Sequence, residues 1–562
     1  MVKEKLSKEY VRRLLARRSS IQITKGLWNM HFEDLARLML PRRLGFVTQT
    51  SEGERRTEEI YDATSMQAAR GLANAVGQLS RPEGEKLFFI RPEDDRLASS
   101  YEIQEWLKYC EDRQLKAMYN PKARFRQALG EADIDLVVFG TAVVFAGQSR
   151  KSRRLRYNTI DLKSIEISID EENQPDTVFQ SRKFTLRQAE MRFGKENLSE
   201  ALNRKLNSKD DKNTEEKTEF LRVIMPRPNG KSDSIYSKNW PYTDIWIEVE
   251  AEEAVEVGGF REFPFAIPRW DTTSGEVYGR SPGMIALPDA ETLNAMSETI
   301  LVAGQKAADP PVFAPNDSSF DAINSFSGGI TYYDVDTAVQ LRGNPFFTIE
   351  RGFNLPITRD MQSDTRAQVE AAFFKNIFNL PVKGPEMTAT EVLIRKEEFI
   401  REMGPVFGRL ESDYIAPIVE RTFSILLRDG YFDPIPDAIK GKNIRFEYNS
   451  PINKVREQAQ VAASRLWLQQ LSELNAVKPE AFVMDRVDAD VLAMFSARAL
   501  DLPQGAVAGD DKVKETRATR EKQNQDMMER NKVTQEAQIA ASAGGAFKDV
   551  VQTLGGNNKT TT

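Results

Sequence analysis

Apolar residues recur at steps of three and four along two stretches in the middle of the chain. The first stretch runs over residues 288–307, and its apolar positions are Leu293, Met296, Ile300, Ala303 and Ala307. The second covers about residues 358–379, with one side formed by Met361, Thr365, Val369, Ala372 and Phe373. This spacing predicts two helices that pack lengthwise against neighbours. We expect Asp289 to be the N-cap of the first helix and Pro310 to end it.

The connection between these helices is rich in Gly, Pro, Asn and Ser and holds three short β-like runs. They lie near Val312, at residues 330–333 and at residues 339–341. Two narrow helices with a small module at their far end make a stalk. Because this stalk has little apolar surface of its own, we expect copies of the chain to pack side by side.

Residues 1–270 change from a helical pattern to a β pattern. Helices are predicted at residues 1–18, 28–39, 55–79, 101–118 and 123–136, and strands at residues 142–146, 155–160, 165–168, 177–183, 220–225, 244–249 and 263–268. One helix, capped by Thr185 and closed by Gly194, interrupts the strands. Residues 203–217 are charged and predict an exposed loop. The pattern indicates one α+β body with helices packed on a largely antiparallel sheet.

A short loop, LPVKGPEMTAT at residues 380–390, follows the stalk. A long helix then runs to Gly430, and Pro405 and Pro417 should each bend it because proline removes a backbone donor and crowds the preceding turn. Residues 451–502 predict a smaller helical region. Beyond it we expect an amphipathic helix within residues 512–541 and disorder over residues 544–562.

Composition narrows the classes of function. The 562 residues include 78 basic and 84 acidic side chains, a net charge of -6, so no basic excess predicts tight nucleic-acid binding. No apolar run approaches the length of a membrane span and no signal peptide is recognisable, which indicates an intracellular, soluble protein without a membrane partner. The single cysteine, Cys110, lies at helical spacing from Trp106 and Leu107 and is expected to be a buried thiol.

Catalytic chemistry has few residues to use. His31 is the only histidine, and neither a G-x-x-x-x-G-K-[ST] loop nor a dinucleotide-binding G-x-G-x-x-G occurs. Three acidic groups could in principle hold the divalent metals of a nuclease: Asp133 with Asp135, residues 170–172, and Asp488 with Asp490. Solvated or capping roles are favoured for them. We therefore predict no catalytic residue, no metal site and no cofactor.

One dense segment, FPFAIPRWDTTSGEVYGRSPGMIALPDAETLN at residues 263–294, resembles the portal proteins of short-tailed bacteriophages, also called head-to-tail connecting proteins. Further segments agree in order: YDATSMQAARGLANAVGQL from Tyr61, ALGEADIDLVVFGTAVVF from Ala128, RKFTLRQAEMRFG from Arg182 and TATEVLIRKEEF from Thr388. The resemblance covers about residues 3–502.

The resemblance implies a mainly helical α+β portal fold. Its parts would be a wing (1–275), a turn and first stem helix (276–309), a clip (310–355), a second stem helix (356–379), a channel loop (380–390), a long kinked wing helix (391–430), a crown (431–509) and a C-terminal tail (510–562). It also implies a ring of twelve subunits at one capsid vertex of the virion, assembled in the host cytoplasm. Such a ring conducts double-stranded DNA, binds the terminase large subunit and then tail adaptor proteins, contacts capsid and scaffolding proteins, and is not an enzyme.

Candidate DNA-contacting residues can be named only if the chain forms the ring that the resemblance implies. Lys383 on the channel loop would form a girdle of positive charge, with Arg366, Lys375 and Lys306 on the stem helices adding others. The remaining loop positions are Leu380, Pro381, Val382, Gly384, Pro385 and Glu386. Acidic neighbours would keep contact with DNA weak, although the cations could equally be solvated or paired with carboxylates.

Two further features have structural alternatives. The clip aromatics Tyr332, Tyr333, Phe346 and Phe347 could anchor a partner or be buried within and between clips. In the segment before the first stem helix, Gly275 and Gly279 permit a tight turn, and Arg280 could cap a helix end. Two other classes stay open: a structural adaptor or scaffold that forms no ring, and a metal-dependent nuclease.

Overall fold

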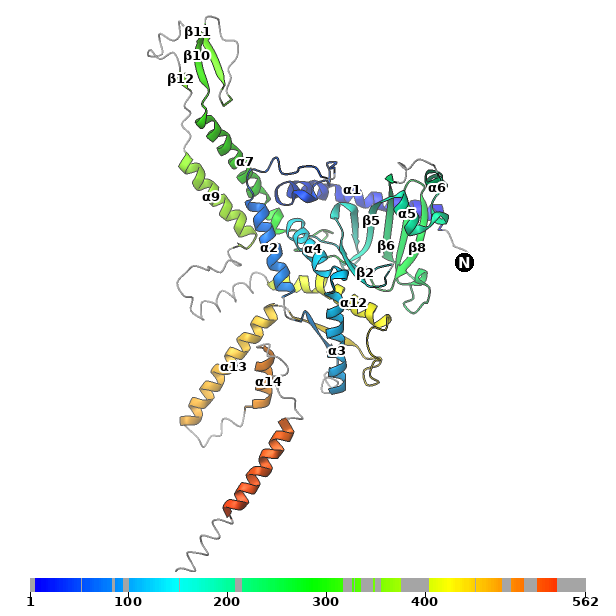
Figure 1. The fold of residues 1–562 in the computed structure, drawn as a ribbon, viewed down its shortest axis with the longest axis vertical. Helices are drawn as coiled ribbons and strands as arrows, with labels where there is room; N and C mark the ends of the chain where they lie inside the picture. Colours follow the sequence, from blue (N-terminus) through cyan, green and yellow to red (C-terminus); the bar gives the residue numbers. More distant parts are fainter. Residues whose placement is uncertain are drawn as a thin grey trace, which may run out of the picture. The chain divides into compact units, whose positions relative to one another are not determined.

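The computed structural model describes residues 6–51, 53–82, 86–94, 101–150, 152–207, 215–316, 326–327, 329–334, 347–348, 355–375, 404–449, 451–477, 487–499 and 513–532. The chain divides into two compact units, Met1–Ile452 and Asn453–Thr562. Most of the described structure belongs to the first unit (Figure 1).

A single long helix, α1 (Lys8–Met39), opens the first unit where two helices were predicted. Its first half packs Val11 and Leu14 on the large sheet, and its second half places Phe32 and Leu35 in the main helical core. The two apolar stripes therefore face two different cores. They do not mark two helices, and no proline interrupts the helix between them.

Three more helices build the main core: α2 (Thr64–Ser80), α3 (Tyr101–Met118) and α4 (Phe125–Phe139). The helix predicted from residue 55 starts later because the carboxylate of Asp62 accepts a hydrogen bond from the backbone N–H of Thr64, which fixes the chain in a turn there (2.8 Å). The α4 helix ends at Gly140, whose φ of +74° is the left-handed conformation typical of a helix end. Cys110 of α3 is buried as predicted, and burial raises the pKa of its thiol to about 12.

The predicted sheet is present and antiparallel. Its five strands follow one another in chain order: β4 (Ile165–Ile169), β5 (Pro175–Thr185), β6 (Lys217–Pro226), β7 (Tyr242–Glu248) and β8 (Glu253–Phe260). One face carries α5 (Leu186–Phe193) and α6 (Glu200–Asn207), and the other lies against α1. The alternation along β6 explains this layering, because Phe220 packs beneath the two short helices while Leu221 faces α1.

Two details of this region differ from expectation. The edge strand β8 was missed because its glycines and glutamates weaken the apolar alternation. Residues 203–217, predicted to be a loop, include the end of α6 and the first residue of β6, and residues 208–214 lie outside the described residues. The predicted caps of α5, Thr185 and Gly194, are confirmed. The Thr185 hydroxyl accepts from the Gln188 N–H, and the Gln188 side chain accepts from the Thr185 N–H, a reciprocal capping box that was not predicted.

A second, three-stranded sheet has the order β3-β2-β9, from β2 (Val144–Gln148), β3 (Leu155–Thr159) and β9 (Phe265–Ala266). A two-stranded sheet pairs β1 (Phe88–Pro92) with β13 (Ile444–Tyr448), which brings segments far apart in sequence together. Both of these sheets contribute to the main core.

The stalk consists of α7 (Pro282–Ala308) and α9 (Leu355–Ala372), which run side by side (Figure 1). The α7 helix starts earlier than predicted: its N-cap is Ser281 and not Asp289, eight residues later. The Ser281 hydroxyl accepts from the Met284 N–H at 3.0 Å. The exposed Pro288 lies inside the helix. Burial of the preceding turn, with Ala286 fully buried, outweighs the one lost hydrogen bond.

The small module at the end of α7 is a three-stranded sheet of order β11-β10-β12. Its strands are β10 (Val312–Asn316), β11 (Ile330–Asp334) and β12 (Phe347–Thr348), with β10 and β11 parallel and β10 and β12 antiparallel. Two of the three predicted β runs are confirmed. The third, at residues 339–341, lies outside the described residues.

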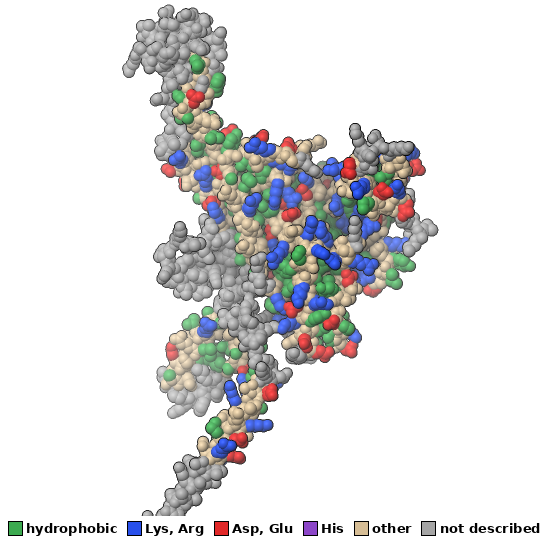
Figure 2. All heavy atoms as spheres, viewed as in Figure 1, with side chains coloured by type: hydrophobic (Ala, Val, Ile, Leu, Met, Phe, Trp, Pro, Cys, Tyr) green, Lys and Arg blue, Asp and Glu red, His purple; other side chains and the backbone are tan. Residues whose placement is uncertain are grey.

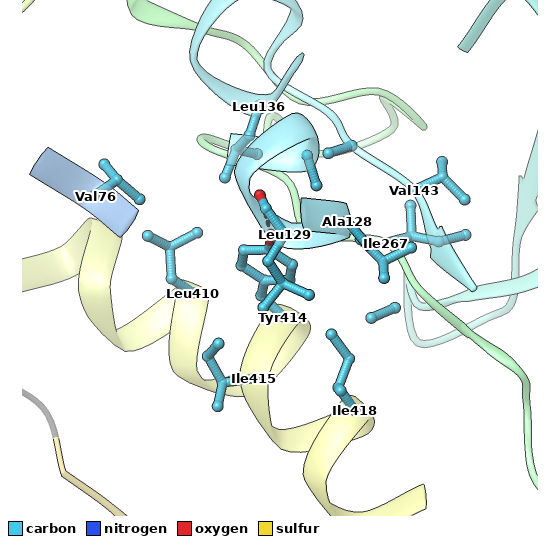
Figure 3. Packing of buried hydrophobic residues seen from close by; sticks show 14 of the residues in the cluster. Val76, Ala128, Leu129, Leu136, Val143, Ile267, Leu410, Tyr414, Ile415 and Ile418 are labelled. Carbon is cyan, nitrogen blue, oxygen red and sulfur yellow. Dashed lines mark hydrogen bonds between the residues drawn. The ribbon is translucent and has the colours of Figure 1, made fainter. Parts of the chain in front are cut away.

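The long helix after the stalk is described from residue 404 and includes a π-turn (Glu411–Ile415) followed by α12 (Ala416–Arg428). This π-turn is the irregularity in the helix that was expected near Pro417. The proline ring crowds the carbonyl four residues earlier, and the wider π-turn accommodates that group. The turn also directs Tyr414 toward Leu129 of α4 (Figure 3).

In the second unit the described residues form α14 (Ala489–Ala499), a helix at residues 513–532 and nearly all of α13 (Pro451–Val477). The helix at 513–532 confirms that part of the helix predicted within residues 512–541, whereas residues 512 and 533–562 lie outside the described residues. None of the described helices is apolar over a stretch long enough to cross a membrane.

Candidate functional site: the root of the stalk

A buried polar network joins the two stalk helices to each other and to the turn before α2. The Gln362 side chain of α9 donates to the Ser297 hydroxyl of α7 at 2.7 Å, and Ser297 donates to the Leu293 carbonyl at 2.9 Å. Asp62 accepts from Arg366 of α9, with distances of 3.2 Å to Nε and 2.8 Å to Nη2. The two helices are therefore tied together by specific hydrogen bonds in addition to apolar contact.

Asn294 of α7 makes the second connection. Its side-chain oxygen accepts from the backbone N–H groups of Tyr61 (2.8 Å) and Asp62 (3.3 Å), and its amide nitrogen donates to the Glu59 carbonyl (2.9 Å). Three backbone groups of a non-helical segment are satisfied in this way. The stalk is consequently anchored to the body at a defined height.

Charge at the root is balanced within the chain. Burial alone would raise the pKa of the Asp62 carboxyl, but the hydrogen bonds from Thr64 and Arg366 outweigh it and hold the pKa below its ordinary value. The Asp62 side chain is 7% exposed and that of Arg366 is 44% exposed. The pair thus lies at the edge of the protein, with the carboxylate inside and part of the guanidinium still accessible to solvent.

The predicted cations occupy different environments. Arg366 is in the pair just described, Lys375 pairs with Glu370 five residues earlier, and Lys306 is exposed in the last turn of α7. Among the residues predicted to face inward on the second stalk helix, Val369 of α9 and Phe373, just after its end, are buried, whereas Met361 is 52% exposed.

Several predicted positions cannot be placed. All of the predicted channel loop lies outside the described residues: Leu380, Pro381, Val382, Lys383, Gly384, Pro385 and Glu386. Of the clip aromatics, Tyr332 and Tyr333 belong to β11 and Phe347 to β12, while Phe346 lies outside the described residues. Their roles stay predictions.

The turn into the stalk depends on close backbone approach. A Cβ atom at Gly279 would lie 2.4 Å from the Gly140 carbonyl oxygen, so only glycine fits there, and Gly275 has a φ of +86°. Arg280 does not cap a helix end, as had been expected. Its guanidinium pairs with Glu276 (2.9 Å from Nε) and lies over the Trp28 ring at 4.7 Å, because the turn brings it onto α1.

The carboxylates considered for metal binding have other partners. Asp133 and Asp135 are buried in ion pairs, Asp133 with Arg81 and Asp135 with Arg43 (2.7 and 3.0 Å), so the expectation of solvated or capping roles was wrong for these two. Burial raises the pKa of Asp135 to about 6. The run of apolar residues around both aspartates could have indicated burial, since a helix that is apolar on all sides is surrounded by protein.

In the other two acidic groups, Asp170 and Asp488 cap backbone turns as expected, whereas Asp490 pairs with Arg517 at 2.7 Å. The Asp170 carboxylate accepts from the backbone N–H groups of Glu172 and Gln174, and Asp488 accepts from those of Asp490 and Val491 at the start of α14. Within the described residues, no group of three or more His, Cys, Asp or Glu side chains is placed to hold a metal ion.

The network residues Asp62, Asn294, Ser297 and Gln362 were not predicted. Their only signal was that Asn294, Ser297 and Gln362 interrupt the inward-facing sides of two otherwise apolar helices. A polar residue on such a face must find a hydrogen-bond partner when it is buried. Its partner, however, could not be named from the sequence.

An α+β body that carries a helical hairpin, anchored at its root and ending in a small sheet, defines a structural, stalk-bearing class of protein (Figure 1). The chain matches the family described as "Bacteriophage head to tail connecting protein" over residues 11–507, and it belongs to that family. The resemblance found in the sequence and the mainly helical α+β fold are both confirmed.

Two curated relatives cover most of the chain. One is a "Portal protein" of Salmonella phage epsilon15, 26% identical over 491 residues that make up 85% of each chain. Another is a "Probable portal protein" of Bordetella phage BPP-1, 25% identical over 555 residues, or 97% of this chain and 98% of the relative.

Proposed function

We propose that this chain is a portal protein whose copies form a ring at one vertex of a bacteriophage capsid. The central channel would conduct double-stranded DNA during packaging and ejection, and the ring would bind the packaging terminase and later the tail. The family match over residues 11–507 carries this proposal, and the names of both relatives support it. The ring would assemble in the host cytoplasm with capsid and scaffolding proteins.

Exposed apolar side chains support the association of copies. On α1, Ile23 and Leu27 are each 80% exposed and Met30 is 59% exposed, and their spacing of four and three residues places them on one side of the helix. On the stalk, Leu301, Val302 and Met361 are also exposed. Surfaces of this kind mark sites of protein contact, and a closed ring would cover them on every subunit.

The mass of the purified protein tests the ring. Twelve copies of the 63.7 kDa chain would give about 760 kDa, whereas an adaptor that forms no ring would stay small. Light scattering after size exclusion measures this directly, and negative-stain images would show a central hole. A chain that stays folded and monomeric at high concentration would overturn the proposal.

The charges of the stalk fit a channel that holds DNA weakly. Asp62 and Glu370 already pair with Arg366 and Lys375 within the subunit, which reduces the number of free cations available to phosphates. Each phosphate neutralised by a protein adds affinity, and strong attachment would oppose sliding. We therefore assign the main contact with moving DNA to Lys383 of the channel loop.

Charge reversal tests this assignment. Lys383→Glu should leave ring assembly intact and lower the amount of DNA packaged per particle, because a girdle of repeated positive charge becomes negative. Lys183→Glu, an exposed lysine on β5, is the matched control and should package normally. If both variants package the same amount of DNA as the unaltered protein, Lys383 has no part in the mechanism.

A further inference from the structure

A large basic cavity lies in the first unit, away from the stalk. Its volume is about 1180 Å³, and its walls come from the three-stranded sheet, strands β5 to β8 of the larger sheet, and α12. Ten of its lining side chains are basic and four are acidic. Figure 2 shows several Lys and Arg side chains over the region where Figure 1 labels β2 and α12. A chain with a net charge of -6 thus concentrates positive charge in one hollow.

The deeper guanidinium groups are held rigidly. Arg222 forms a bidentate pair with Asp244 (2.7 and 2.9 Å), and Arg421 donates to the Ala146 carbonyl (2.7 Å) and to Glu262. Arg428 also pairs with Glu262. Fixed donors of this kind bind an anion without a further loss of side-chain freedom.

Positive charge exceeds what the carboxylates neutralise. Burial lowers the pKa of Arg192 and of Arg421 to about 10. Neither Arg154 nor Arg182, both exposed at this cavity, forms an ion pair with any described residue. An incoming anion would therefore find unpaired cations at the cavity.

Unsatisfied polar atoms point to a ligand independently. The indole N–H of Trp246, the side-chain oxygen of Gln180 and the Nε atoms of Arg192 and Arg261 are buried without a hydrogen-bond partner among the described residues, and all four side chains line the cavity. Trp246 and Gln180 are 1% and 4% exposed. Buried polar groups of folded proteins nearly always have partners. A ligand with acceptor oxygens for the three N–H groups and an N–H donor for the Gln180 oxygen would complete this site.

The aromatic rings narrow the class of ligand. Arg192 lies over Trp246 at 4.2 Å, Arg222 lies over Phe145 and Phe260 at 5.0 and 5.5 Å, and Arg261 lies over Trp240. Single-stranded nucleic acid binds by stacking bases on free aromatic faces, and arginines already cover these faces. Duplex DNA presents its phosphates on a convex cylinder and suits protruding elements better than a hollow.

We infer that this cavity binds an acidic peptide segment of a partner protein, rich in Asp and Glu. Carboxylates on separate side chains can reach separate guanidinium groups and form bidentate pairs. The volume also exceeds the 300 to about 1000 Å³ typical of small-molecule sites, as an extended peptide requires. This inference does not depend on ring formation or on the channel.

Fluorescence anisotropy with a short labelled poly-glutamate peptide and the full-length chain tests it. Arg154→Glu combined with Arg182→Glu should weaken binding by about tenfold or more, since each reversal replaces attraction with repulsion. Arg70→Glu combined with Arg187→Glu reverses two exposed arginines outside the cavity and should bind like the unaltered protein. Binding should also weaken as salt is raised.

Two outcomes would overturn the inference: the unaltered protein fails to bind the peptide, or the cavity variant binds as tightly as the control. A single-stranded thymidine oligonucleotide provides the competing arm. If it binds more tightly than the peptide and loses affinity in the same variant, the cavity is a nucleic-acid site instead. Should the charge reversals disturb folding, Arg154→Gln with Arg182→Gln removes the charges more gently and should weaken binding in the same direction.

Discussion

The hydroxyl of Tyr414 connects the long helix after the stalk to the core of the body. Tyr414 is fully buried, and its hydroxyl lies 3.1 Å from the Leu129 carbonyl (Figure 3) and 3.0 Å from the Asp133 carboxylate. Asp133 also pairs with Arg81. Tyr414→Phe keeps the ring and removes one donor from a buried carboxylate. A hydrogen bond to a charged group contributes about 1.5–3 kcal/mol, so we expect a loss of about 2 kcal/mol.

Tyr157→Phe is the matched control. Tyr157 is equally buried, and its hydroxyl lies 2.8 Å from the Thr422 hydroxyl of α12, which itself donates to the Ile418 carbonyl at 2.6 Å. Tyr157 is therefore the donor, and its acceptor is neutral. A bond between neutral groups contributes about 1 kcal/mol, so this variant should lose roughly half as much stability.

Hydrogen exchange measured by mass spectrometry is the suitable assay, because a chain of this size need not unfold in one step. Opening free energies of peptides from residues 125–139 and 404–428 should fall more in Tyr414→Phe than in Tyr157→Phe. Burial raises the pKa of Asp133, and losing a donor to the ionised form raises it further, so lower pH should restore part of the stability. Equal losses in both variants, or a loss below about 0.5 kcal/mol for Tyr414→Phe, would refute the reasoning.

Three further predictions concern pH, assembly and the stalk root. Burial lowers the pKa of Lys25 to about 8, so between pH 8 and pH 10.5 the folded state binds fewer protons than the unfolded state. The free energy of unfolding should therefore rise with pH in this range by at most about 1.4 kcal/mol per pH unit, and thermal melts of Lys25→Met should lack this rise. Leu27→Asp should shift the protein from ring to smaller species in light scattering, whereas Met191→Asp, also on an exposed helix surface, should not. Arg366→Gln leaves the mostly buried Asp62 with one partner fewer and should cost about 1 kcal/mol, seen as faster exchange in α9; unchanged exchange would mean that the pair does not hold the stalk.

Local signals in the sequence predicted most elements because each depends on neighbouring residues. The caps of α5 at Thr185 and Gly194, the ends of α3 and the presence of the two stalk helices follow from capping residues and a 3.6-residue period. The errors lie where distant contacts decide. The single helix α1 was predicted as two helices because its halves face different cores. The predicted start of α7 was too late because the helix continues through Pro288, which the surrounding packing tolerates.

Sequence alone determined the class of this protein: a stalk between two patterned helices, few residues suited to catalysis, and segments typical of head-to-tail connecting proteins. Only the tertiary structure decided which charges are neutralised. Arg366 meets Asp62, 304 positions away, and the basic cavity collects side chains from Lys122 to Asp429. Helical periodicity and capping depend on residues close together in the sequence. The partner of a charged side chain depends on which distant segments are buried together, so no local sequence pattern predicts it.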